Sequence, residues 1–296
     1  MPAKIIVAAT PPDAAADAVA LAVDLARARG ASLLVAGVAV VPMMADREVF
    51  ARAQRGAMER ELSLLVPHDT DGVEAGIAVV VSRSITRGLH SLAEREHADL
   101  LVMGPTHRGT IERVFQGDLI LSTLHGSTCP IAVAPAGYAD RTSEDRPMMG
   151  VAIDGGEESD AVLDAAVTLA EQMGASLRIV HVAETPIGYA VPPWLDAAGS
   201  ARYLEAVRAE GNAVLQRAEE KVDGRVPVST KLLSGLPGEE LARFGSEVDL
   251  LVMGSRAYGT VGRVIVGSTA GRVLHDAPCA VLVLPQTVLS EVPALT

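Results

Sequence analysis

Short runs of consecutive apolar residues alternate along the chain with longer stretches in which apolar residues recur every three or four positions. In the C-terminal half, the runs that predict strands lie at residues 149–153, 177–182, 226–233, 250–253 and 280–284. The stretches that predict helices lie at residues 159–172, 201–222, 239–246 and 268–275. Runs such as LLVM and VLVL lack polar alternation, which is typical of strands covered on both faces. The alternating order therefore predicts an α/β fold with a parallel, doubly wound sheet.

The same pattern occurs twice. Gly30-Ala31-Ser32-Leu33 returns 144 residues later at positions 174–177, and the sequence DLLVMG at residues 99–104 returns 150 residues later at 249–254. Further identities keep the spacing of 150 up to Pro285. A period of this length indicates duplication of a whole domain and excludes a solenoid of short repeats.

The length of 296 residues also fits two domains of ordinary size. We expect these domains at residues 1–138 and 147–290, with the polar stretch GYADRTSEDRP at 137–147 as the linker. Hydrophobic residues make up 49% of the chain but aromatic residues only 3%, so the two cores must consist mainly of Ala, Val, Leu and Ile.

Net charge, hydropathy and cysteine content exclude several functional classes. A formal charge of −12 repels nucleic-acid phosphates, so no nucleic-acid partner is expected. No apolar run approaches the roughly 20 residues of a membrane span. The start of the chain also lacks the apolar core of a secretory signal, so we expect a cytoplasmic protein without a membrane partner. Cys129 and Cys279 occupy equivalent places before apolar strands and are interpreted as small buried hydrophobic residues, not as a redox pair.

Two loops of the C-terminal half are candidates for ligand binding. In a doubly wound sheet, the ligand crevice opens at the carboxyl ends of the strands. There, Asp154-Gly155-Gly156 follows the first strand, and GSRAYGTVGRVIVGS at residues 254–268 follows the fourth. Glycines let backbone amides approach a phosphate, and the start of the last helix, at Ser268 and Thr269, supplies unpaired N–H groups. Ser268 either caps this helix or donates its hydroxyl to a phosphate oxygen.

These residues resemble the universal stress proteins in their tandem form, over residues 4–285 and including the closing sequence HDAPCAVLVLP. In ATP-binding members of that family the loop reads G-x2-G-x9-G-[ST]. Gly254, Gly267 and Ser268 match this motif with the correct spacing. Asp154 matches an aspartate that lies near the ribose.

The resemblance implies two tandem Rossmann-like (HUP-type) domains, each with a five-stranded parallel sheet in the order 3-2-1-4-5. It also implies that backbone groups of Val182 face the adenine, and that the ligand is ATP, with Mg or Mn where a counter-ion is used. Ala257 departs from the motif because it replaces the second glycine. If that position needs a positive φ, the substitution costs on the order of 1 kcal/mol, which Gly259 nearby offers to relieve. Arg256 either approaches the phosphates or points into solvent.

The N-terminal copy departs further from the motif. Thr10 replaces the aspartate, His107 the second glycine, and Asp118 the Ser/Thr at the start of the helix. An aspartate at a helix N-terminus repels a phosphate at the same place by several kcal/mol in a partly dry crevice. We therefore expect the first site to be empty or differently used.

No catalytic or metal-binding constellation is visible. The patterns G-x-S-x-G and GxxxxGK[ST] are absent. His90 and His97 are seven residues apart without a visible third ligand. We therefore favour a regulatory, stress-survival protein that binds ATP or a related adenine nucleotide in its second domain. The alternatives are a slow ATPase or phosphotransferase, and a ligand-free scaffold in which the loop glycines and Asp154 merely shape turns.

The order 3-2-1-4-5 also bears on assembly, because it leaves the fifth strand at a sheet edge. Residues 131–134 and 280–284 are uncharged, and bare apolar edges invite aggregation. We expect the two fifth strands to pair and form an internal pseudo-dimer. An unidentified protein partner and a homodimer are further expectations.

Overall fold

The computed structural model describes residues 3–10, 15–42, 47–66, 72–105, 113–141, 146–184, 197–255 and 267–285. Their contacts divide the chain into two compact units, one built mainly from the N-terminal half and the other mainly from the C-terminal half. The elements of the first half are β1 (Lys4–Ala8), α1 (Ala16–Arg29), β2 (Ser32–Val40), α2 (Arg47–Leu65), β3 (Ala75–Ser82), α3 (Ile85–Glu96), β4 (Leu100–Met103), α4 (Arg113–Leu124), β5 (Ile131–Val133) and the 3-10 turn η2 (Tyr138–Asp140). Those of the second half are β6 (Met148–Ala152), α5 (Glu157–Met173), β7 (Ser176–Glu184), α6 (Ala197–Val222), β8 (Val228–Gly235), α7 (Pro237–Phe244), the 3-10 turn η3 (Gly245–Glu247), β9 (Leu250–Gly254), α8 (Ser268–Asp276) and β10 (Ala280–Leu284).

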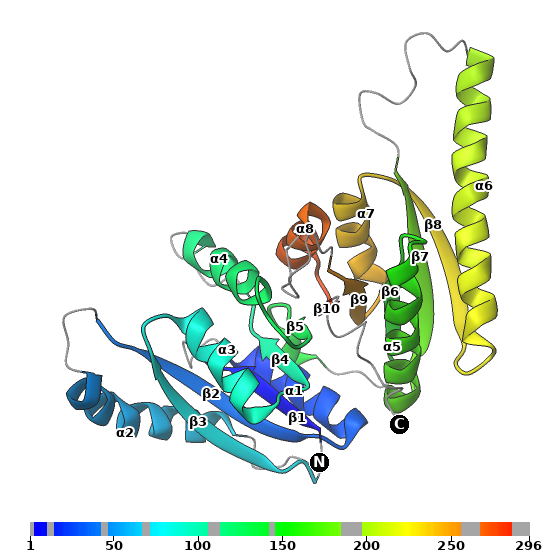
Figure 1. Ribbon diagram of the computed structural model, residues 1–296. Coiled ribbons are helices and arrows are strands. Elements are labelled where there is room, and N and C mark those ends of the chain that lie inside the picture. The colour runs from blue at the N-terminus through cyan, green and yellow to red at the C-terminus, as the bar shows by residue number, and fades with distance from the viewer. Residues whose placement is uncertain are drawn as a thin grey trace. The chain divides into compact units, whose positions relative to one another are not determined.

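Each half contains a sheet with the same strand order. In the first half the order is β3-β2-β1-β4-β5, and in the second half it is β10-β9-β6-β7-β8. Counted within each half, the first order reads 3-2-1-4-5, and the second is the same order when read from β8 to β10. The ladders of the central strands are parallel: β1 pairs with β2 and β4, and β6 pairs with β7 and β9. The predicted Rossmann-like α/β fold is therefore confirmed (Figure 1).

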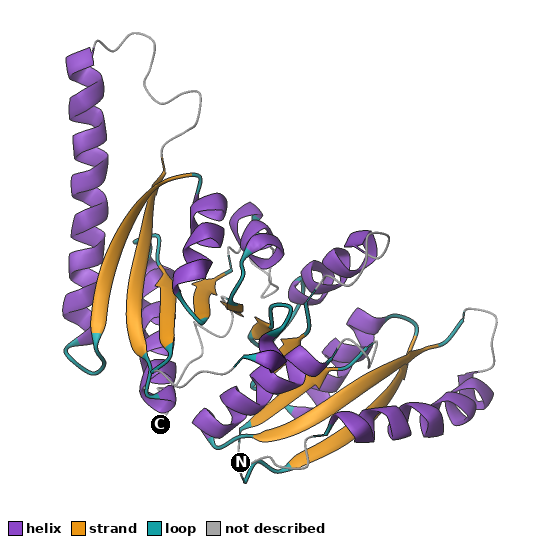
Figure 2. Cartoon of the chain, turned by 180° about the vertical axis from the view of Figure 1, so that it is seen from behind, coloured by secondary structure: helices purple, strands orange, loops and turns teal. Residues whose placement is uncertain are grey.

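Helices cover both faces of each sheet (Figure 2). In the first half, Gly37 of β2 lies against Met58 of α2, whereas its neighbour Val38 lies against Gly88 of α3 on the opposite face. In the second half, Gly211 of α6 approaches one face of the sheet at Leu232. Gly150 of β6 lies against Phe244 of α7 on the other face. The continuous apolar strands of the sequence are thus explained by burial on two sides.

Small and branched aliphatic residues fill both cores, as the composition predicts. Cys129 and Cys279 are buried and form no disulfide bond, which confirms their interpretation as core residues. Burial raises the pKa of the Cys129 thiol to about 11, so this side chain stays protonated and poorly nucleophilic at neutral pH.

Several boundaries differ from the sequence-based prediction, and three of them have a clear physical meaning. β8 runs from Val228 to Gly235, two residues later than expected, because Pro227 interrupts the apolar run near its start. α6 begins at Ala197, and from residue 199 onward its first buried position is Gly211. The predicted linker begins with η2, which the buried carboxylate of Asp17 holds against α1 by accepting the amides of Gly137 and Ala139.

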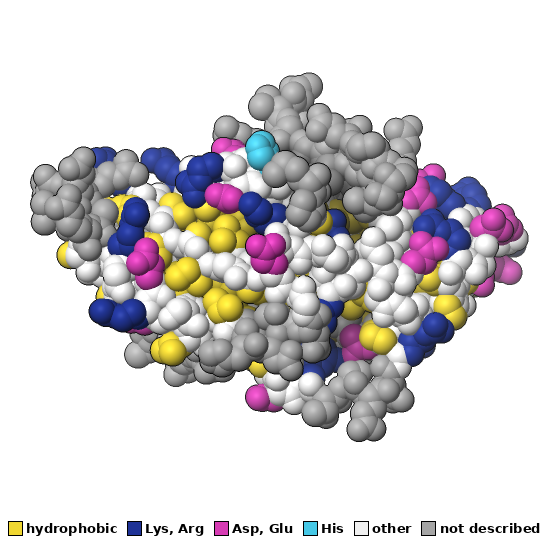
Figure 3. All heavy atoms as spheres, turned by 90° about the horizontal axis from the view of Figure 1, so that it is seen from below, with side chains coloured by type: hydrophobic (Ala, Val, Ile, Leu, Met, Phe, Trp, Pro, Cys, Tyr) yellow, Lys and Arg dark blue, Asp and Glu magenta, His cyan; other side chains and the backbone are white. Residues whose placement is uncertain are grey.

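Within the described ranges, no helix is long and apolar enough to cross a membrane. On the face drawn in Figure 3, basic and acidic side chains are interspersed and form no large patch of one sign.

Candidate functional site

Three predicted site residues lie at one edge of the second sheet. β6 and β9 are neighbours with Ala152 opposite Met253, and β7 lies on the other side of β6. Because the strands are parallel, their carboxyl ends meet at the same edge. Asp154 follows β6 by two residues, Gly254 ends β9, and Val182 lies near the end of β7. The fold therefore brings these three positions together.

The turn after β6 is held by hydrogen bonds within its own loop. The Oδ1 atom of Asp154 accepts the Gly156 amide at 2.9 Å and the Ser159 hydroxyl at 2.7 Å. The Ser159 oxygen in turn accepts the amides of Asp154 and Gly155, each at 3.1 Å. Asp154 thus shapes the turn, as one of its two predicted roles requires.

Gly155 is the residue of this turn that no other amino acid replaces easily. Its φ of +83° lies in the left-handed region, which disfavours side chains. A Cβ atom there would also lie 2.9 Å from the Cγ2 atom of Val214 on α6. The loop backbone therefore passes directly over α6, and the crevice edge at this point consists of main-chain atoms.

Val182 presents its backbone to the space beyond the end of β6. The amide of Ile153 donates to the carbonyl oxygen of Val180 at 3.0 Å, so the polar groups of Val180 face β6. In a parallel ladder, alternate residues face the same neighbouring strand, so those of Val182 point the same way. β6 has ended at that level, with Asp154 turned toward its own loop. The N–H and C=O groups of Val182 therefore point past the end of β6, at the carboxyl edge of the sheet.

Gly254 and the start of α8 lie at the same edge. A Cβ atom on Gly254 would be 3.1 Å from the Cγ2 atom of Val162, so the end of β9 passes close to α5. Gly267 is the N-cap residue of α8, with extended backbone angles and no side-chain cap. Ser268 is the exposed first residue of the helix and Thr269 is half-buried. The expectation that Ser268 caps the helix is thus wrong, because Gly267 occupies that position.

Several predicted residues lie outside the described ranges. Arg256, Ala257 and Gly259 belong to residues 256–266, which the structure does not describe. His107 of the first half is likewise outside. Ser255, the last described residue before the gap, is buried, and its hydroxyl has no hydrogen-bond partner among the described residues.

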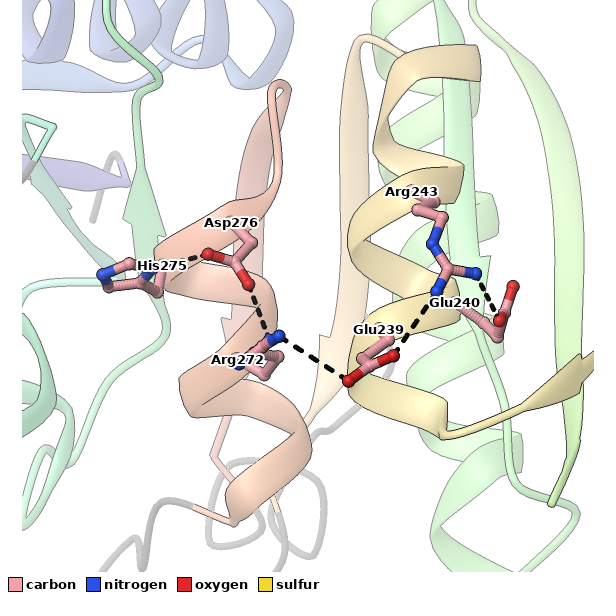
Figure 4. A network of polar contacts seen from close by, with 6 residues as sticks. All are labelled: Glu239, Glu240, Arg243, Arg272, His275 and Asp276. Carbon is pink, nitrogen blue, oxygen red and sulfur yellow. Dashed lines mark hydrogen bonds and ion pairs between the residues drawn. The ribbon is translucent and has the colours of Figure 1, made fainter. Parts of the chain in front are cut away.

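A chain of ion pairs joins α8 to α7 (Figure 4). Arg272 contacts Asp276 on its own helix at 2.6 Å and Glu239 of α7 at 3.6 Å. Arg243 extends the chain by pairing with Glu239 at 3.4 Å and with Glu240. These exposed charges fix the α8 side of the crevice to the rest of the second half.

The corresponding edge of the first half is built differently. Thr10, in place of Asp154, accepts the amide of Val38 with its Oγ1 atom at 3.0 Å. Asp118, in place of Ser268, belongs to α4, and its side chain is outside the described part. The Thr10 contact could not be predicted from the sequence, because it depends on a side-chain rotamer. Ser159 was missed for the same reason, although a serine five residues after an aspartate is a visible turn signal.

The histidines near these edges have structural partners. A ring nitrogen of His90 lies 2.7 Å from the Thr123 carbonyl oxygen, and one of His181 lies 3.0 Å from that of Ile153. Across the described ranges, no group of three His, Cys, Asp or Glu side chains is arranged to hold a metal ion.

The profile of the universal stress protein family matches residues 1–135 and again residues 148–285. This chain belongs to the universal stress protein family. Universal stress protein Rv2319c of Mycobacterium tuberculosis is 28% identical over 280 residues, which cover 90% of this chain and 94% of the relative. A universal stress protein of Thermus aquaticus is 33% identical over 138 residues, which cover 45% of this chain and 95% of that protein.

Solved structures agree on the fold. A universal stress protein from Archaeoglobus fulgidus matches 95% of this chain and 96% of its own with a TM-score of 0.59 at 16% identity. A protein of unknown function from Pseudomonas aeruginosa matches 97% of this chain and 93% of its own with a TM-score of 0.63 at 13% identity. The tandem form recognised from the repeat is therefore confirmed.

Proposed function

We propose that the second half of this universal stress protein binds ATP or a related adenine nucleotide and acts as a regulatory module in the stress response. The observation that carries the proposal is the crevice edge formed by Asp154, Val182, Gly254 and Gly267. Their backbone groups converge where a doubly wound sheet offers its ligand site. We expect the domains at residues 1–138 and 147–290 to be the functional units.

The residues at this edge fit the parts of a nucleotide. The amide and carbonyl of Val182 match the hydrogen-bonding edge of a purine ring. Gly267 leaves the first amides of α8 without a side-chain cap, so these donors are available to phosphate oxygens, assisted by the Ser268 hydroxyl and the Thr269 amide. Gly254 lets the end of β9 approach α5 more closely than a residue with a side chain would without a shift of Val162. Asp154 supplies a carboxylate near the ribose while it holds the turn.

We propose binding without rapid turnover. Chemistry on a phosphoryl group requires a positioned base and charge-stabilising groups. Asp154 is the one acidic residue among those predicted for this site, and its Oδ1 atom is engaged in the turn. A Mg or Mn ion would thus be held chiefly by the phosphates. A slow ATPase remains the alternative function, and a steady-state phosphate-release assay on purified protein tests it.

The first experiment is to release any bound small molecule from purified protein with acid and identify it by absorbance and mass. Calorimetry with ATP then compares Gly267→Glu with Gly117→Glu, the equivalent change in the first half. A carboxylate at the start of α8 repels the phosphates, so we expect Gly267→Glu to weaken binding at least about a hundredfold. Gly117→Glu should bind like wild type. Equal binding by all three proteins, or none by wild type, would contradict the proposed function.

The alternative of a ligand-free scaffold makes the opposite prediction. Calorimetry should then detect no ATP binding by wild type, and neither substitution should change that result. The pairing of the two fifth strands and a homodimer stay predictions, and equilibrium sedimentation tests the homodimer.

A further inference from the structure

The two halves use the same backbone amide differently. Val38 and Val182 are equivalent, because each lies two residues beyond the β2 or β7 residue whose carbonyl accepts the amide that follows β1 or β6. The Val38 amide donates to the Oγ1 atom of Thr10 at 3.0 Å. In the second half, no described side chain occupies the Val182 amide, and Asp154 is turned toward Gly156 and Ser159.

The hydroxyl of Thr10 occupies the Val38 amide, which is the backbone donor equivalent to that of Val182. Val38 is buried and Thr10 is half-buried, so their hydrogen bond lies at the wall of the crevice and not on the open surface. A ring nitrogen that sought the Val38 amide would first have to displace the threonine hydroxyl. Displacement leaves that hydroxyl without its donor in a partly buried place, which a ligand must compensate.

We infer that Thr10 is a specificity-determining residue: its hydroxyl takes the place of the base of a nucleotide and keeps the first half from binding one. We call this contact the Thr10 lock. The inference rests on the proposed function, because it assumes that the equivalent amide of Val182 receives the base. Asp118 is expected to repel the phosphates at the other end of the ligand, so the Thr10 lock is a second barrier to nucleotide binding in the first half.

The same contact can be introduced into the second half by placing a threonine at position 154, which allows a matched test. Asp154→Thr and Asp154→Val both remove the carboxylate and its bonds to Gly156 and Ser159, and their side chains have nearly the same shape. Only threonine carries the hydroxyl that reaches the Val182 amide. We therefore expect Asp154→Thr to bind ATP about tenfold more weakly than Asp154→Val in calorimetry. Equal affinities, or tighter binding by Asp154→Thr, would overturn the inference.

A second measurement does not depend on nucleotide binding. Hydrogen exchange of the Val38 amide, followed by NMR, should be about tenfold faster in Thr10→Val than in wild type, because the acceptor is gone. Thr10→Ser keeps the hydroxyl and should restore slow exchange. Unchanged exchange in Thr10→Val would show that the lock does not exist. If wild type binds no ATP but the exchange pattern holds, the proposed function fails while the Thr10 contact stands.

Discussion

The ends of β1 and β6 occupy equivalent places in two copies of one fold, yet the side chains that follow them form different hydrogen bonds. After β1, Thr10 points across to β2 and bonds to the Val38 amide. After β6, Asp154 folds back on its own turn, and the crevice keeps its backbone donors. One substitution at one position thus separates a closed edge from an open one, although the sheets match strand for strand. In this duplicated chain, the fold is shared, and the proposed difference in nucleotide binding rests on a few side chains.

The two equivalent helix pairs are also joined by different contacts. α7 and α8 are joined by exposed ion pairs through Arg272 and Glu239. The equivalent pair α3 and α4 is joined by His90 and the Thr123 carbonyl oxygen. The Thr123 hydroxyl is fully buried and has no partner among the described residues, whereas its equivalent in the second half is Val273. At this position the first half therefore carries a buried polar cost that the second half avoids.

Among substitutions that remove a single structural contact, the largest effect is expected at the open turn. Ser159→Ala removes the acceptor for the amides of Asp154 and Gly155, which should destabilise the turn by about 1–2 kcal/mol and weaken ATP binding by about tenfold. Calorimetry and hydrogen exchange of residues 154–156 measure the two effects. Thr168→Ala on the same helix is the control, because its hydroxyl bonds only to the exposed Asp164 carbonyl oxygen. Loss of affinity in the control alone would contradict the role of Ser159.

A smaller effect is expected in the first half. Thr123→Val replaces a buried, unpartnered hydroxyl by a methyl group and copies the residue of the second half. The free energy of unfolding of the first half should rise by about 1 kcal/mol, because the desolvated oxygen is removed without loss of volume. Urea denaturation followed by hydrogen exchange measures this change. The control is Thr123→Ala, which leaves a cavity and should not be stabilising. Destabilisation by Thr123→Val would contradict the prediction, because it would show that the hydroxyl stabilises the fold.

The smallest effect is expected at the α7–α8 ion pairs. Arg272 is 55% exposed and its partners Glu239 and Asp276 are each 35% exposed, so Arg272→Ala should lower stability by only about 0.5 kcal/mol at low salt. The difference from wild type should vanish at about 1 M NaCl, where charges are screened within a few ångströms. Thermal denaturation at two salt concentrations tests this. An effect that persists in high salt would mean that packing of the Arg272 stem, and not its charge, joins the helices.

The sequence predicts the shared part of this molecule well and the difference between its halves only in part. Uninterrupted apolar strands and the repeat of DLLVMG are enough to predict two parallel sheets, because burial on both faces leaves a strong pattern. The sequence did not predict that residues 199–210 of α6 stay outside the core. Apolar periodicity continues through Leu204 and Val207, although no residue of this stretch is buried. The Thr10 contact was missed because hydrogen bonds of small polar side chains depend on local geometry that no periodicity records.

The account is tested most directly by determining the structure of the protein with ATP. We expect one nucleotide per chain, with its base at the Val182 amide, its phosphates at Gly267, and the Thr10 hydroxyl still bonded to Val38. A nucleotide at the end of β1, with Thr10 displaced from the Val38 amide, would contradict the central claim that the first crevice is closed and the second open.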